Sequence, residues 1–191
     1  FAALNISSAD VSNGLILNTF FMYSNDLTTI DLSQNGNLQR VNLQSNDLTS
    51  LDVSSNPSLT ELRLNTNDLA TFSITNNSLL TNLELRGNAL PTADLDQIVN
   101  DLDAFGLSNG NLEISNNAGD LSTASFAAYT NLVARGWTID VPAPAPDTEP
   151  PVIGTLNPAS NILQTGLTLT WTAATDNVGV TNYNVFQDNV L

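Results

Sequence analysis

The sequence repeats one pattern of leucines and asparagine at a step of 21 residues. The pattern is L-x-x-L-x-L-x-x-N-x-L, and it occurs as LQRVNLQSNDL (38–48), LTELRLNTNDL (59–69) and LTNLELRGNAL (80–90). A fourth copy, LNTFFMYSNDL, covers 17–27 with phenylalanine and methionine at two of the apolar positions. One such unit is too short to bury its own apolar side chains, so the units must stack on one another.

Each unit has two parts. The L-x-L pair alternates with a period of two, which predicts a strand whose leucines face the core and whose other residues face outward. The asparagine that follows would satisfy backbone groups of neighbouring coils. A second motif, IDLSQN, LDVSSN or FSITNN, fills the return path and ends on Asn35, Asn56 or Asn77. We therefore expect an extended or turn-like return rather than a helix.

The repeat changes at both ends. Phe1, Leu4, Ile6 and Val11 fit a shortened first coil, whose outward residues would be Asn5 and Ser7. At the other end, we expect a rung at Leu112, Ile114 and Asn117 and a last strand at Trp137, Ile139 and Val141. Two helical returns precede these strands. The first is 91–106, with Leu95, Ile98, Val99 and Leu102 inward and Gly106 at its end; the second is 122–136, with Phe126, Tyr129 and Val133 inward and Gly136 at its end.

The in-phase copies closely resemble the leucine-rich repeat family over residues 1–141, in the 21-residue form of secreted, internalin-like bacterial proteins. The resemblance implies a leucine-rich repeat solenoid with a parallel concave β-sheet. The convex side would be mostly non-helical, with two helical returns at the C-terminal end. The chain opens on Phe1, and we expect it to be a mature or trimmed fragment.

Residues 142–191 do not continue the 21-residue repeat. Residues 142–150 form a proline-rich linker, which would be extended and stiff. In 151–191, the segments GLTLTWTAATD and TNYNVFQD alternate as strands and resemble the first strands of a fibronectin type III domain. The resemblance implies an incomplete β-sandwich segment, because the later strands of that family have no counterpart. Its unpaired strands could mediate self-association.

Composition argues against several functions. The net charge of −15, with four cations in 191 residues, argues against nucleic acid and against an anionic membrane surface. No apolar run is long enough for membrane insertion. Histidine and cysteine are both missing, so the sequence has no catalytic triad of the usual kinds, no imidazole or thiolate metal site and no disulfide. We expect no enzyme, no cofactor and no metal.

Two groups of carboxylates could be taken for metal-binding or catalytic sites, but each has a simpler structural explanation. Asp94, Asp96, Asp101 and Asp103 fit the solvated face of a helix. Asp26, Asp47 and Asp68 follow the repeat asparagines and would form an acidic edge, which either aids solubility or collects divalent cations weakly.

The outward positions of the strands carry three of the four cations, Arg40, Arg63 and Arg86. Arg40 would face Glu61 across adjacent strands, and Arg63 would face Glu84, in pairs that fix the register. No carboxylate lies straight across from Arg86. Two aromatic residues are also outward, and they either pack against a missing cap or bind a ligand. The candidate ligand-binding residues are Phe21, Tyr23, Arg40, Asn42, Arg63, Glu84 and Arg86.

The sequence thus predicts a non-catalytic, secreted or surface-displayed adhesion protein that recognises an extracellular protein through the concave sheet. One alternative is a carbohydrate-binding module of a larger secreted enzyme or adhesin, with a polysaccharide as partner. A second alternative is a structural stalk without a specific ligand.

Overall fold

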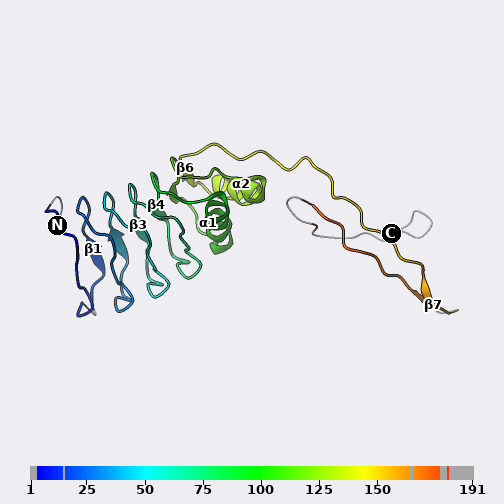
Figure 1. Cartoon of the computed structure of the whole chain (residues 1–191), viewed down its shortest axis with the longest axis horizontal. Helices are drawn as coiled ribbons and strands as arrows, with labels where there is room; N and C mark the ends of the chain where they lie inside the picture. Colours follow the sequence, from blue (N-terminus) through cyan, green and yellow to red (C-terminus); the bar gives the residue numbers. More distant parts are fainter. Residues whose placement is uncertain (1–3, 15, 164–165, 177–179, 181–191) are drawn as a thin grey trace. The chain divides into compact units, whose positions relative to one another are not determined.

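The computed structural model describes residues 4–14, 16–163, 166–176 and 180. The chain divides into two compact units, Phe1–Ala145 and Pro146–Leu191. Figure 1 shows the first unit as a row of stacked coils that ends in the helices α1 (Thr92–Phe105) and α2 (Phe126–Ala134). Each unit is described by itself.

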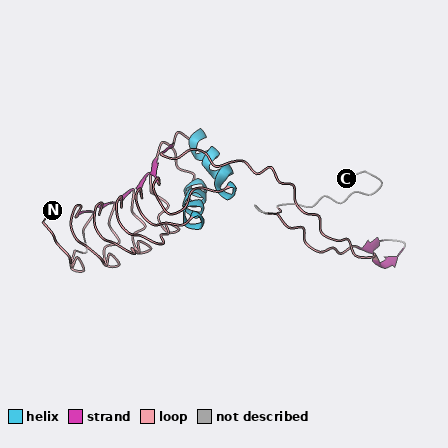
Figure 2. Cartoon of the chain, turned by 45° about the horizontal axis from the view of Figure 1, so that its top comes forward, coloured by secondary structure: helices cyan, strands magenta, loops and turns pink. Residues whose placement is uncertain are grey.

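The first unit contains one parallel sheet in which every strand pairs with the next strand along the chain. The register is in phase with the repeat, for example Val41 opposite Leu62 and Leu62 opposite Leu83. Figure 2 shows these short strands along one side of the coils and the return segments on the other. The strands are β1 (Thr19–Phe21), β2 (Arg40–Asn42), β3 (Glu61–Arg63), β4 (Asn82–Glu84), β5 (Asn111–Glu113) and β6 (Thr138–Ile139).

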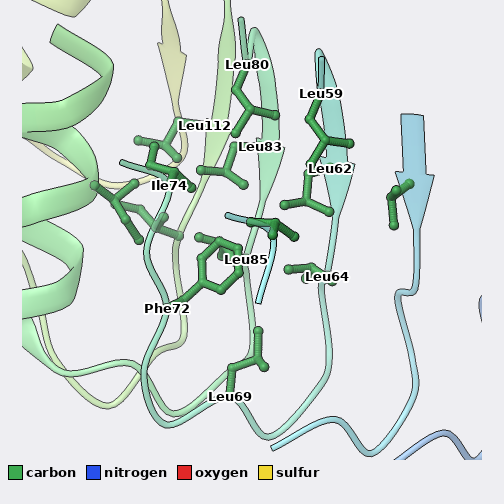
Figure 3. Packing of buried hydrophobic residues seen from close by; sticks show 14 of the residues in the cluster. Leu59, Leu62, Leu64, Leu69, Phe72, Ile74, Leu80, Leu83, Leu85 and Leu112 are labelled. Atoms are coloured by element: carbon green, nitrogen blue, oxygen red, sulfur yellow. The ribbon is translucent and has the colours of Figure 1, made fainter. Parts of the chain in front are cut away.

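The repeat leucines form the core between the sheet and the return segments. Leu62, Leu64 and Leu69 of one coil have no exposed surface, and Phe72 and Ile74 of its return segment are also buried. Figure 3 shows these side chains pointing into the same interior as those of the neighbouring coils. Burying a leucine contributes about 1.5–3 kcal/mol. The solenoid is therefore held together by repeated apolar contact between neighbouring coils.

Two ladders of buried asparagine connect the coils. In the first ladder, Asn46 accepts a hydrogen bond from Leu27 N (3.1 Å) and donates to Met22 O (3.0 Å) of the preceding coil. Asn67, Asn88 and Asn117 repeat this arrangement. In the second ladder, Asn56 donates to Leu32 O and Asn35 O, both at 3.0 Å. The expectation that asparagine satisfies backbone groups of neighbouring coils is confirmed.

The residue before each asparagine of the first ladder, and before Asn25 in line with them, has a left-handed backbone. The φ angle is 54° at Ser24 and Ser45, 59° at Thr66, 69° at Gly87 and 58° at Asn116. The chain turns sharply here, from the strand into the asparagine. Glycine reaches this conformation without steric cost, whereas serine and threonine do not.

Helix α1 (Thr92–Phe105) forms as expected, with Leu95, Ile98, Val99 and Leu102 buried and Gly106 left-handed at its end. The expectation that Asp96 is solvated is wrong. Its side chain is 7% exposed and accepts hydrogen bonds from Ser122 N (2.9 Å), Ser122 Oγ and Ser125 Oγ (2.7 Å). Asp94 accepts from Thr71 Oγ1 and Phe72 N. Both carboxylates therefore attach α1 to neighbouring segments.

The second helical return is a 3-10 turn, η1 (Thr123–Ser125), followed by helix α2 (Phe126–Ala134). The inward face predicted for it is wrong in part. Ala128 and Leu132 are buried, whereas Val133 is 49% exposed. Hydrogen bonds from Ser122 and Ser125 to Asp96 fix how the start of this helix lies against α1. The spacing of apolar residues, from which the inward face was predicted, contains no information about these hydrogen bonds.

The first coil departs from the prediction. Leu4 is 60% exposed, and no strand forms in residues 4–14, where Asn5 and Ser7 were expected to face outward from one. The coil still joins the stack, because Asn25 Oδ1 accepts from Leu4 N and Ile6 N. Residues 4–14 follow the next coil at the regular step of 21, because Ile6 O accepts from Asp26 N as Leu27 O does from Asp47 N, and Val11 O accepts from Asn35 as Leu32 O does from Asn56. They occupy the turn and return positions of a coil, not a strand position, so the predicted shortened coil is wrong. Phe1 lies outside the described residues.

In the second unit, the described residues form an antiparallel ladder. Val152 pairs with Thr175, Leu156 pairs with Trp171, and β7 (Ser160–Leu163) pairs with β8 (Gly166–Thr168). The expected strand GLTLTWTAATD thus lies in an antiparallel pair. The expected strand TNYNVFQD lies outside the described residues. The fibronectin type III assignment and the boundaries 1–141, 142–150 and 151–191 stay predictions.

Candidate ligand-binding face

The outward side chains of β1–β6 and of the residues that continue these strands form one surface, called here the sheet face. All seven ligand-binding residues predicted from the sequence lie on it. Its members are Thr19, Phe21, Tyr23, Arg40, Asn42, Gln44, Glu61, Arg63, Asn65, Asn82, Glu84, Arg86, Asn111, Glu113, Ser115, Thr138 and Asp140.

Arg63 lies between two carboxylates. Its Nε is 2.7 Å from Glu61 Oε1 on its own strand and 3.3 Å from Glu84 Oε1 on the next strand. The predicted pairing of Arg63 with Glu84 is confirmed. The Nε–H is not directed at an acceptor with hydrogen-bonding geometry, so the attraction is mainly that of opposite charges. An ion pair this accessible contributes at most about 1 kcal/mol.

Glu84 is the centre of a polar network. It is 8% exposed and accepts hydrogen bonds from Asn65 Nδ2 (3.1 Å) and Asn82 Nδ2 (3.0 Å). Asn82 in turn accepts from Asn111 Nδ2 at 3.0 Å. The network reaches across β3, β4 and β5 and fixes the side chains of that half of the sheet face. Glu84 is therefore a structural carboxylate with little surface left for a ligand.

Arg86 has carboxylate partners that the cross-strand pairing did not reveal. Its Nε is 3.4 Å from Asp140 Oδ2, and its Nη2 is 3.6 Å from Glu113 Oε2. Asp140 also accepts from Ser115 N and Ser115 Oγ (2.6 Å). The sequence did contain a signal for Asp140. If Ile139 and Val141 face inward, Asp140 must face outward on the same surface as Arg86.

Arg40 differs from the other cations. It stands opposite Glu61 in the register, but the predicted Arg40–Glu61 ion pair is wrong because Glu61 pairs with Arg63. Arg40 instead donates to Thr19 Oγ1 (3.3 Å) and lies over the Phe21 ring, 5.9 Å from its centroid. Arg135 pairs with Asp103 at 2.7 Å. Among the residues that the structure describes, Arg40 is thus the one cation without a carboxylate within 4 Å.

The N-terminal part of the sheet face combines this arginine with exposed aromatic rings. Phe21 and Tyr23 are each 37% exposed. Asn42 lies beside them and accepts from Gln44 N at 3.1 Å. We call Phe21, Tyr23, Arg40, Asn42 and Gln44 the β1–β2 patch. Aromatic residues and arginine carry much of the binding energy in protein interfaces, and this patch combines both residue types with exposed surface.

The described residues contain no candidate metal site and no candidate membrane-spanning helix. No group of three or more His, Cys, Asp or Glu side chains among them is arranged to hold a metal ion. No helix in this part of the chain has the length and apolar character needed to cross a membrane. The sheet face presents hydrogen-bonding groups, aromatic surface and, at Arg40, an arginine without a carboxylate within 4 Å among the described residues.

Two solved structures from Listeria monocytogenes are similar to this chain. One is the functional domain of InlJ, which includes a cysteine ladder; it is 24% identical with a TM-score of 0.54, over 66% of this chain and 26% of that one. The other is the internalin inlF, 21% identical with a TM-score of 0.58, over 69% of this chain and 37% of that one. Similarity at this level concerns the fold.

Two chitinases share local sequence similarity with this chain. Chitinase Chi52 of Paenibacillus xylanexedens is 46% identical over 48 residues, which are 25% of this chain. Chitinase A1 of Niallia circulans is 38% identical over 74 residues, which are 39% of this chain. In both cases the matched segment spans 9% of the chitinase.

No family model matches the sequence. The fold rests on three agreeing observations: the 21-residue pattern, a parallel sheet that follows this pattern strand by strand, and the two structures that share the arrangement. The first unit of this chain is a leucine-rich repeat solenoid.

Proposed function

We propose that the chain is a non-catalytic binding protein that recognises a protein partner through the β1–β2 patch of its sheet face. The observation that carries the proposal is the contrast within that face. Arg63 and Arg86 each lie within 4 Å of two carboxylates, whereas Arg40 has none among the described residues and lies over the exposed ring of Phe21, on the strand that Tyr23 continues. A partner carboxylate could pair with Arg40 while apolar groups cover Phe21 and Tyr23.

The proposal narrows the predicted site. Phe21, Tyr23, Arg40 and Asn42 stay candidate ligand-binding residues. Arg63, Glu84 and Arg86 are assigned to the network that holds the strands in register, since their charged groups already have partners. We propose that the protein acts outside the cell, secreted or displayed at the surface, as an adhesion protein. The second unit would serve as a spacer or as a site of self-association.

The test is a peptide-display selection on the immobilised full chain, followed by affinity measurements on the enriched peptides. Tyr23→Ala should lower affinity at least tenfold, since a hot-spot aromatic contributes about 2 kcal/mol or more. Arg40→Gln should lower affinity and weaken its dependence on salt. Val133→Ala truncates an exposed apolar side chain on α2 and is the matched control. Peptides that bind all four proteins equally well would contradict the proposal.

A second candidate function is a carbohydrate-binding module of a larger secreted enzyme or adhesin. The local similarity to two chitinases favours it. A glycan array probed with the full chain separates the two candidates. Sugar binding at the β1–β2 patch should disappear in Tyr23→Ala and change little with salt, because a neutral sugar has no charge to screen.

A further inference from the structure

At the last strand of the sheet, a side chain does what the backbone does in the coil before it. After β4, Leu85 N donates to the backbone carbonyl of Glu113 on the next strand, at 2.7 Å. After β5, Ile114 N donates instead to the side chain of Asp140, whose Oδ1 lies at 2.7 Å. The backbone pairing ends with β6, and the Asp140 carboxylate takes over directly after it.

The Asp140 carboxylate makes several contacts with the body of the solenoid. Besides Ile114 N, it accepts hydrogen bonds from Ser115 N (3.1 Å) and Ser115 Oγ (2.6 Å). The guanidinium of Arg86 adds an ion pair, with Nε 3.4 Å from Oδ2. Hydrogen bonds to a charged acceptor are about twice as strong as those between neutral groups. One side chain therefore attaches the chain to the sheet after the last strand.

The residues that follow depend on this attachment. We call residues 140–144 the strap. Pro142 and Pro144 have no backbone N–H, so the strap cannot continue the pairing of the sheet. A second attachment comes from α2, where the hydroxyl of Tyr129 donates to Val141 O at 2.9 Å. Val141 is partly buried and Pro144 is buried, so the strap lies against the solenoid at both ends.

The strap forms one side of a cavity of about 520 Å³. The other side includes Leu95 of α1, Ile114 after β5 and Leu121. Leu95 is 1% exposed and Ile114 is 2% exposed. Moving the strap away would bring this apolar surface into contact with water, which is unfavourable. The closed position is therefore favoured by apolar contact as well as by the two polar attachments.

We propose that the strap opens and closes as one unit over this cavity while the sheet and both helices stay folded, and that Asp140 is the latch that keeps it closed. Local opening of this kind occurs where few backbone hydrogen bonds hold a segment. Tyr129 provides the second attachment. The strap follows the last strand of the sheet, whereas the β1–β2 patch lies on its first two strands, so neither proposal depends on the other.

The test uses single thiols in the full chain, which has no cysteine of its own. Leu95→Cys places a thiol beside the cavity. Leu102→Cys places one on the same helix, at a buried position that does not line the cavity. When opening is fast relative to labelling, the rate at which the disulfide reagent DTNB labels each thiol is proportional to the fraction of molecules in which that position is open to solvent.

In the Leu95→Cys chain, adding Asp140→Ala should raise the labelling rate at least tenfold, because hydrogen bonds to a charged group are lost. Adding Asp140→Asn keeps one acceptor oxygen and should raise the rate less. Adding Tyr129→Phe removes one neutral hydrogen bond and should raise it about fivefold. In the Leu102→Cys chain, none of these changes should alter the rate.

Two matched controls should leave the Leu95→Cys rate unchanged. Asp120→Ala removes an exposed carboxylate that lines the same cavity. Thr130→Val removes a hydroxyl group of α2 that donates to Phe126 O.

Two results would overturn the proposal. Equal labelling rates in Asp140→Ala and Asp120→Ala would show that Asp140 does not hold the strap. Equal acceleration of Leu95→Cys and Leu102→Cys would show that the helical end unfolds as a whole. Thermal unfolding identifies a reporter that is misfolded, and Leu121→Cys, which lines the same cavity, then replaces Leu95→Cys.

Discussion

At the scale of single residues, the left-handed turn before the asparagines of the first ladder destabilises the backbone in coil after coil. Glycine occupies the turn in one coil, but serine or threonine does so in three others. An L-residue in this conformation loses about 1–2 kcal/mol. The coil tolerates the cost because the asparagine that follows makes several buried hydrogen bonds.

Thr66→Gly should raise the free energy of unfolding by about 0.5–1 kcal/mol, since relief of the left-handed strain exceeds the added entropy of the unfolded chain. Urea unfolding measures the change. Gly87→Ala is the reciprocal control and should destabilise by about 1 kcal/mol. A Cβ at Gly87 would lie 3.7 Å from Thr66 N, an ordinary contact, so the backbone alone accounts for this loss. A stabilised Gly87→Ala protein would contradict the explanation.

The turns that begin each return segment belong to the scale of elements. The backbone N–H of Ser33 holds the pKa of Asp31 below its ordinary value, and Ser54 does the same for Asp52. At Asp10, the hydroxyl of Ser12 is the main cause of the lowered pKa. Because the folded pKa is depressed, each turn adds stability above the unfolded pKa of about 3.9 and loses it as the pH falls through the folded value.

The double variant Asp31→Asn and Asp52→Asn should therefore lose part of the dependence of stability on pH below about pH 4. Above pH 5 the wild type should be the more stable protein, because its turns keep charged acceptors. Thermal unfolding from pH 2 to pH 7 gives both curves. Parallel curves would show that these turns do not stabilise the fold through the charged form of the carboxylate.

Another element-scale feature is Asp96, which connects α1 to the start of α2. Asp96→Ala should lower the free energy of unfolding by about 3 kcal/mol, because a charged acceptor is removed from half-buried Ser122 and buried Ser125. Hydrogen exchange should show the loss concentrated in residues 126–134. Asp101→Ala removes a more accessible carboxylate of the same helix and should cost less than about 1 kcal/mol. Uniform loss of protection would contradict this local role.

The sequence predicts elements better than side-chain partners. The period of two and the 21-residue step predicted the strands and their register, since a shift of one residue would expose every leucine. They could not predict that Glu61 pairs with Arg63 rather than with Arg40, because all three lie within reach on the same face. Nor could they reveal that Asp96 is buried, since its partners lie 26 and 29 residues away on another element.

At the scale of the whole molecule, the excess of negative charge is the main electrostatic influence on stability. The chain carries 19 acidic and 4 basic residues. Carboxylates without a cationic partner repel one another in the folded state. Salt screens this repulsion, which stabilises the fold, and also weakens the few ion pairs, which destabilises it. Because acidic residues are in large excess, we expect the loss of repulsion to be the larger effect.

The temperature of unfolding should therefore rise when the salt concentration is increased from about 0.01 M to about 0.5 M, where the Debye length falls from about 30 Å to a few ångströms. Differential scanning calorimetry in NaCl and in KCl makes the measurement. Equal effects of the two salts would indicate screening, and an effect of one cation alone would indicate a specific site. A fall in unfolding temperature with both salts would show that the ion pairs of the sheet face outweigh the repulsion.

The asparagine ladders have a mechanical consequence. Each ladder asparagine is hydrogen-bonded to the coil before it, so a pull on the two ends of the solenoid would detach coils in succession. Every coil released between β1 and β4 adds 21 residues of chain, about 70 Å when fully extended. A solenoid of this kind that is attached at one end and pulled at the other would therefore lengthen in steps, and the coils not yet detached would stay folded.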